Sequence, residues 1–157
     1  MNIVMDADCL IKLTKAKLKE LVCKNFKVVI PQVVKEEVVD HALAYPDAMV
    51  IQENLEKNLL TISKGPVSLK KREEAVLKIY QRGKFDAIGS DDKRFIKKLQ
   101  LLNIPYIPPA VFIVLLVKRR QIALKVAQIF LDALGPLISD GEYYTVQWIL
   151  NDARRVS

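Results

Sequence analysis

The chain has 157 residues, of which 51% are hydrophobic, and its formal net charge is +7 at pH 7. This length fits one domain with one core, and the longest apolar run, eight residues at 110–117, is too short to span a membrane. The basic excess, 25 Lys and Arg against 18 Asp and Glu, favours a polyanionic partner, although solubility alone explains it equally well.

The chain alternates between strand and helix patterns over its first half, and no signal-peptide pattern opens it, so a cytoplasmic protein is expected. The predicted elements are a strand at 2–5, a helix at 10–22, a strand at 27–30, a helix from Pro31 to about residue 44, and weak strands at 49–51 and 59–62.

The second half continues the alternation and then becomes helical. Its predicted elements are a helix at 69–81 capped by Ser68, a strand at 86–89, a helix at 91–102, a strand at 104–107, helices at 109–118 and 121–134, and a last helix with a Ser139–Glu142 capping box. Alternating strands and helices predict a parallel sheet covered by helices on both faces. We expect a single domain over 1–157, with residues from about 121 to 157 as an appended helical element.

Acidic residues follow the predicted strands. Asp6 ends the first strand, Glu36 and Glu37 lie on the helix after the second, and Ser90-Asp91-Asp92 ends a late one. Ligands of parallel α/β sheets bind at the carboxyl ends of the strands. We therefore expect the functional site at this edge.

Two segments of the first half resemble motifs of PIN domains. IVMDADCLIKL resembles the first motif, an apolar strand followed by an Asp and an apolar helix start, and this Asp is Asp6. VVIPQVVKEEVVD resembles the second, a strand and a Pro followed by a helix with an acid six residues later, which is Glu37.

Two further segments resemble the remaining motifs. REEAVLKIY resembles the third, an acid directly before Ala on a helix, which is Glu74 where many members have Asp; the adjacent Glu73 is the alternative. AIGSDDKRF resembles the fourth, a strand, a Ser or Thr and an Asp three residues before Phe, which is Asp92, with Asp91 beside it. The resemblance covers roughly residues 1 to 120.

The resemblance implies a three-layer α/β/α fold with a central, mainly parallel sheet of four to five strands. It also implies a metal-dependent endoribonuclease that hydrolyses RNA with a metal-activated water, using Mg²⁺ or Mn²⁺. The catalytic residues would be Asp6, Glu37, Glu74, Asp92 and Ser90, the metal ligands Asp6, Asp92, Asp91 and Glu74, and the RNA-binding residues Lys93, Arg94 and Lys12. Members of the family include toxins restrained by an antitoxin protein and RNA-processing nucleases.

Elementary electrostatics agrees with a metal site. Four carboxylates that met in one place would repel one another, and a divalent cation with oxygen ligands would remove that repulsion. A His-based acid–base pair is excluded within one chain, because His41 is the only histidine. Neither Cys9 nor Cys23 has a neighbouring base in the sequence, and both are expected to be buried and reduced.

Other interpretations of the same residues stay open. Asp91 and Asp8 are each suited to capping a helix. MDADCLI and GSDD also resemble motifs of haloacid-dehalogenase-type phosphatases, and a non-catalytic PIN module that binds RNA or protein is a third function; a receiver domain lacks a convincing Asp and Lys pair. In the last helix, Tyr143, Tyr144 and Trp148 are expected to pack within the domain, with a homodimer contact as the alternative.

Overall fold

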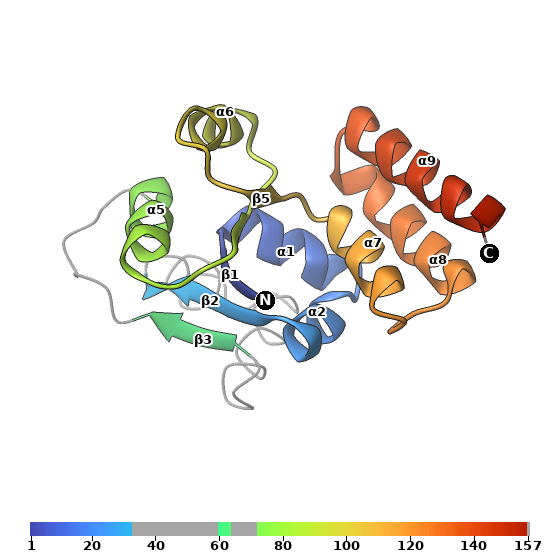
Figure 1. Ribbon diagram of the computed structural model, residues 1–157, viewed down its shortest axis with the longest axis horizontal. Helices are drawn as coiled ribbons and strands as arrows, with labels where there is room; N and C mark the ends of the chain where they lie inside the picture. Colours follow the sequence, from blue (N-terminus) through green and yellow to red (C-terminus); the bar gives the residue numbers. More distant parts are fainter. Residues whose placement is uncertain (33–59, 64–71, 157) are drawn as a thin grey trace.

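Five parallel strands form one sheet in the order β3-β2-β1-β4-β5 in the computed structural model, which describes residues 1–32, 60–63 and 72–156 (Figure 1). The strands are β1 (Asn2–Met5), β2 (Lys27–Pro31), β3 (Leu60–Ser63), β4 (Ala87–Gly89) and β5 (Tyr106–Ile107). Met5 of the central strand β1 is paired with Gly89 of β4. The residues that follow these two strands therefore leave the sheet side by side.

Helices pack around the sheet, and three of them lie together at one end of the molecule (Figure 1). In the described residues they are α1 (Ala7–Lys15), α2 (Lys19–Asn25), α5 (Arg72–Arg82), α6 (Lys93–Leu101), α7 (Val111–Lys118), α8 (Leu124–Leu134), the 3₁₀ helix η2 (Gly135–Leu137) and α9 (Asp140–Val156). Helices α7, α8 and α9 lie together at the opposite end of the molecule from α5 and β3 (Figure 1). None of the described helices is long and apolar enough to cross a membrane.

The side chains of β1 alternate between two hydrophobic clusters. Ile3 and Met5 belong to a large cluster with α1, α2, α7, α8 and α9, whereas Val4 belongs to a smaller cluster with Val76 of α5 and Phe95 of α6. Successive strand residues point to opposite faces of a sheet. The two clusters are therefore the two interfaces of a three-layer α/β/α fold, as predicted.

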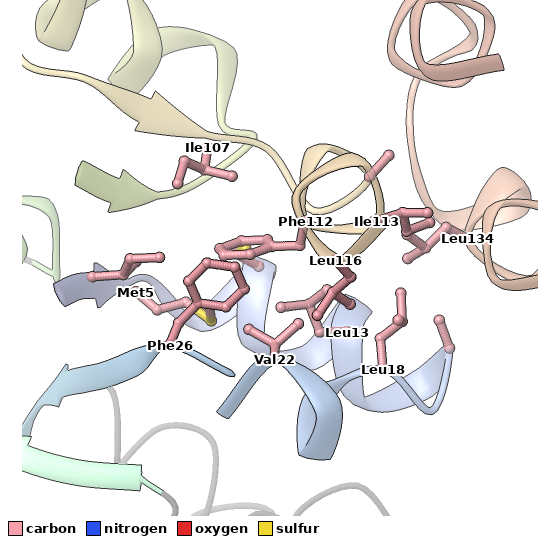
Figure 2. Close-up of a cluster of buried hydrophobic side chains, with 14 of the residues drawn as sticks. Met5, Leu13, Leu18, Val22, Phe26, Ile107, Phe112, Ile113, Leu116 and Leu134 are labelled. Atoms are coloured by element: carbon pink, nitrogen blue, oxygen red, sulfur yellow. The ribbon is translucent and has the colours of Figure 1, made fainter. Parts of the chain in front are cut away.

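The larger cluster joins the C-terminal helices to the sheet layer. Phe26 and Phe112 meet edge to face, with ring centroids 5.6 Å apart, among aliphatic side chains from α1, α2 and α7 (Figure 2). Leu134 at the end of α8 and Leu150 of α9 belong to the same cluster. Helices α8 and α9 thus share this core.

Some predicted elements differ from those observed. The helix expected at 10–22 is two helices, because Lys17 has a left-handed backbone (φ 61°) that ends α1 at Lys15. Pro31, expected to start a helix, is instead the last residue of β2 and pairs with Ser63. Tyr144 and Trp148, expected to pack within the domain, are 67% and 68% exposed.

Other predictions agree with the structure or fall outside it. The strand at 2–5 has the predicted bounds, and Cys9 and Cys23 are buried and free. The strand at 49–51, the Ser68 cap, the body of the helix after Pro31, and His41 lie outside the described residues.

Candidate active site

Asp6 leaves the end of β1 and caps α1. Its backbone N–H donates to the Gly89 carbonyl at 3.0 Å, which continues the β1–β4 pairing by one residue. Its Oδ1 accepts a hydrogen bond from the Cys9 N–H at 2.8 Å. Asp8, expected to cap this helix, lies in its first turn and is exposed. The N-cap is Asp6 because it is the residue that still has extended backbone.

Asp92 has the corresponding position after β4, where it caps α6. Its Oδ1 accepts from the Phe95 N–H at 2.9 Å. The sequence suited Asp91 to this cap, but the residue that caps α6 is Asp92. A carboxylate at the N-terminus of each helix is also favoured by the positive end of the helix dipole.

Ser90 connects the Asp6 carboxylate to the backbone of Asp92. Its side chain is completely buried. Its Oγ accepts from the Asp92 N–H at 3.3 Å, and its hydroxyl is hydrogen-bonded to the Asp6 carboxylate. Ser90 is itself fixed by a backbone hydrogen bond from its N–H to the Ile107 carbonyl. One buried hydroxyl thus holds Asp6 and the start of the Asp92 turn together.

Acidic side chains line a cavity of about 350 Å³ at this edge of the sheet. The cavity is lined by Asp6, Ala7, Asp8, Arg72, Glu73, Asp92 and Phe95. The sequence pattern pointed to this edge because the strand ends converge there. The sequence did not indicate a role for Arg72, because this residue belongs to one of several basic runs that are typical of solvent-exposed surfaces.

The environment of Asp6 disfavours its negative charge. Burial raises the pKa of Asp6 from 3.8 to about 6. The hydrogen bonds from Ser90 and the Cys9 N–H lower this pKa, and the charges of Asp8 and Asp91 raise it. Desolvation therefore dominates, with like-charge repulsion adding to it. A cation in the cavity would stabilise the charged form of Asp6 and so oppose both effects.

Asp91, expected to be a metal ligand, forms an ion pair with Lys12. Its Oδ2 lies 2.5 Å from Lys12 Nζ, and their side chains are only 10% and 27% exposed. Partial burial lowers the pKa of Lys12, but the hydrogen bond and charge of Asp91 outweigh it and raise that pKa overall. Asp91 does not line the cavity that contains Asp6 and Asp92. It lines a second cavity beside it, together with Lys12.

The remaining predicted residues have different outcomes. Glu74 is exposed and does not line the first cavity, whereas the neighbouring Glu73 does. Lys93 and Arg94 are exposed in the first turn of α6, directly after Asp92. Glu37 lies outside the described residues.

The donor set of the first cavity fits Mg²⁺ or Mn²⁺ in its chemistry. Asp6, Asp92 and Glu73 supply carboxylate oxygens, which both ions prefer. Among the described residues, no group of three or more His, Cys, Asp or Glu side chains is arranged to hold a metal ion. Further oxygen donors, from Glu37, water or a bound phosphate, would be needed to complete a coordination sphere.

The comparisons with known proteins agree with this geometry. A family model described as a PIN domain matches residues 2–150, which include the sheet, both helices capped by Asp6 and Asp92, α8 and most of α9. A comparison with curated proteins found no match. PIN domains are generally nucleases, and they typically use divalent metal ions. With nearly its whole length matched, the chain belongs to the PIN-domain family.

Proposed function

We propose that this protein is a Mg²⁺- or Mn²⁺-dependent endoribonuclease, which hydrolyses phosphodiester bonds of RNA with water and without a covalent intermediate. One observation carries the proposal. Asp6 and Asp92, which leave two neighbouring parallel strands, line one cavity and are connected through buried Ser90. Both acids are partly buried, and a cation between them would offset their mutual repulsion and the cost of partial burial.

Asp6 and Asp92 would hold the metal ion. Asp92 Oδ1 is used by the cap of α6, and its Oδ2 has no hydrogen-bond partner among the described residues. Glu37 and Glu73 or Glu74 are the proposed additional donors, with Glu73 favoured because it lines the cavity. We leave Asp91 out of this set because Lys12 already neutralises its charge.

The chemistry follows from what each group contributes. When bound, the metal ion supplies a Lewis acid that polarises the phosphate and lowers the pKa of water. Asp6 and Asp92 would hold that ion, and Ser90 fixes Asp6 through its hydrogen bond. The N-termini of α1 and α6 would favour a bound anionic phosphate.

Basic side chains next to the cavity would bind the RNA backbone. Lys93 and Arg94 are exposed at the start of α6, and Arg72 lines the cavity. Lys12 lines the second cavity. Each contact between such a side chain and a phosphate releases counterions. RNA binding should therefore weaken steeply with added salt.

Two biological roles use this chemistry, a toxin held inactive by an antitoxin protein and an RNA-processing nuclease. Expression of the protein alone in growing cells separates them, because a free toxin arrests growth and a processing nuclease does not. A homodimer through the exposed Tyr144 and Trp148 of α9 is a further proposal. Sedimentation equilibrium of the wild type and of Trp148→Ala tests it.

The function itself is tested by incubating the protein with a 5′-labelled pool of single-stranded RNA in Mn²⁺, Mg²⁺ or EDTA. Metal-dependent cleavage is expected, with none in EDTA. Retention of RNA on a filter without cleavage in either metal would instead favour the non-catalytic binding module. Cleavage that persists in EDTA would rule out the metal-dependent reaction. The family match counts against the phosphatase alternative. Hydrolysis of a small phosphoester would revive that alternative.

A further inference from the structure

A second cavity, of about 440 Å³, lies directly beside the acidic one. It is lined from α1, α6, α7 and α9, and from the segments before α6 and around β5. Asp91 lines this cavity, and the next residue, Asp92, lines the first one. Consecutive residues of one segment therefore line the two cavities. A volume in this range is typical of sites that bind small organic groups.

The charged side of the second cavity is held in a defined arrangement. Lys12 and Asp91 form a partly buried ion pair. Glu142, from the first turn of α9, accepts a hydrogen bond from the Ala110 N–H through Oε1 at 2.9 Å. The capping box expected for Glu142 forms only in part, since the Glu142 N–H donates to Ser139 Oγ while its carboxylate caps α7 instead.

The Glu142 carboxylate retains unused acceptor capacity. Its Oε2 has no hydrogen-bond partner among the described residues. Burial raises the pKa of Glu142, and Asp91 raises it further, while the Ala110 N–H and Lys12 lower it. Lys12 uses one of its three N–H donors on Asp91. The cavity thus offers a fixed acceptor and spare ammonium donors.

The other side of the cavity is apolar. Val146 of α9 is buried there, and Val111 of α7 and Ile96 of α6 are partly buried. Exposed Lys93 lies at the α6 side of the cavity and follows Asp92 in sequence. An apolar wall, a few polar groups and a cation beside the proposed phosphate site match a nucleotide, which has a flat base and an anionic phosphate.

We propose that this second cavity binds the base of a nucleotide that flanks the cleaved phosphate, and that it selects bases with an exocyclic amino group (adenine, cytosine or guanine) over uracil. The inference rests on the proposed ribonuclease function. A Glu carboxylate accepts hydrogen bonds from such amino groups. Uracil has no exocyclic amino group, and its one N3–H donor on that edge lies between two carbonyl oxygens, which would face the negative charge of Glu142.

Glu142→Gln tests the proposal while retaining the fold. The glutamine side-chain oxygen can still accept from the Ala110 N–H, so α7 keeps its cap. The amide removes the charge and adds a donor, which suits a uracil carbonyl. Glu20→Gln is the matched control, because Glu20 lies on α2 with a 60% exposed side chain and lines neither cavity.

The readout is base preference, measured in two ways. A randomised RNA pool cleaved in Mn²⁺ gives the bias at each position around the cut, and fluorescein-labelled RNA pentamers in EDTA give affinity by anisotropy. For the wild type and Glu20→Gln, we expect discrimination against uracil of about tenfold at one flanking position, as for one good base contact. Glu142→Gln should reduce it to about threefold or less.

A second variant blocks the cavity without altering Glu142. Gly141 lines the cavity, and a Cβ placed there would meet only Ser139 Oγ, at 4.0 Å. Gly141→Phe should therefore fill the space, remove the base preference and weaken pentamer binding severalfold.

The possible outcomes separate this proposal from the ribonuclease function. Cleavage with no base bias, or with a bias that both variants retain, would overturn the base site and leave the nuclease standing. Absence of cleavage together with base-selective pentamer binding that Glu142→Gln removes would support the base site and refute the nuclease. Absence of both cleavage and binding would refute the base site and the ribonuclease function together. A partner protein would then be the remaining occupant of the cavity.

Discussion

Asp6 and Asp92 cap two different helices, α1 and α6, and both carboxylates line the same cavity. They meet because β1 and β4 are parallel neighbours, so their carboxyl ends lie at the same edge of the sheet. Each acid therefore has a structural role, helix capping, in addition to its proposed role as a metal ligand. Asparagine preserves the first role and removes the charge needed for the second.

Asp6→Asn should stabilise the metal-free protein at neutral pH. Burial raises the pKa of Asp6 from 3.8 to about 6, and this shift of roughly two units corresponds to about 3 kcal/mol. The folded state binds this proton more tightly than the unfolded state, so the stabilisation is present below the unfolded pKa and is lost as pH rises through about 6. Asparagine is neutral at every pH, so Asp6→Asn keeps this stabilisation above about pH 6.

Urea denaturation in EDTA between pH 3.5 and 8 measures this difference. The free energy of unfolding of Asp6→Asn should exceed that of the wild type above pH 7 and approach it near pH 4. Asp152→Asn, an exposed substitution on α9, should follow the wild type throughout. An Asp6→Asn protein that is less stable than the wild type at pH 7 would mean that the carboxylate itself stabilises the fold.

Mn²⁺ should raise the melting temperature of the wild type, because it binds the native state and not the unfolded chain. At a concentration 100 times the dissociation constant, the stabilisation would be about 2.7 kcal/mol. Asp6→Asn and Asp92→Asn should each lose most of this effect, whereas Asp152→Asn should retain it. Differential scanning calorimetry with and without Mn²⁺ makes the comparison, and an unchanged wild-type melting temperature at millimolar Mn²⁺ would argue against the site.

Ser90→Ala should weaken the site by disconnecting its two acids. Removal of the hydroxyl takes away a hydrogen bond that lowers the pKa of Asp6, and it leaves the Asp92 N–H without that acceptor. We expect a loss of about 1 kcal/mol in stability and a lower affinity for Mn²⁺. Thr14→Val is the control, since it removes a buried hydroxyl whose partner among the described residues is the Leu10 carbonyl. Equal Mn²⁺ affinity in the two variants would show that Ser90 is only structural.

Gly89→Ala should strain the junction that carries Ser90. A Cβ at Gly89 would lie 3.3 Å from Met5 Cγ, so Met5 would have to shift inside the core. The expected cost is about 1–3 kcal/mol. Gly135→Ala is the comparison, because its Cβ would make only ordinary contact with the Tyr143 ring at 3.5 Å and its backbone is already helical. The change in melting temperature relative to the wild type should be negative for Gly89→Ala and positive for Gly135→Ala. Similar melting temperatures of the two variants would contradict the packing at Gly89.

The parts of the fold that depend on local pattern could be predicted from the sequence. The strand at 2–5 and the position of Asp6 after it follow from an apolar run that stops at a charge. The break between α1 and α2 could not be predicted, because the left-handed residue there is Lys17 and not glycine. Nothing in the sequence marks a lysine for that backbone conformation.

The parts of the site that depend on long-range contacts were missed. Asp91, expected beside Asp92 as a metal ligand, pairs instead with Lys12, which is remote in sequence, and it lines the second cavity. The Glu142 carboxylate caps α7 at Ala110, a partner that no local motif indicates. Tyr144 and Trp148 are four residues apart and so share one face of α9, but spacing alone does not say whether another element covers that face.

The most direct test of the proposed site is single-turnover cleavage of 5′-labelled RNA by the wild type, Asp92→Asn and Asp152→Asn in Mn²⁺. Asparagine at position 92 can still accept from the Phe95 N–H, so the cap of α6 and the fold should be retained. We predict cleavage by the wild type and Asp152→Asn, and a loss of at least about 100-fold in Asp92→Asn, as expected when a metal ligand is removed. Undiminished cleavage by a folded Asp92→Asn protein would contradict the site.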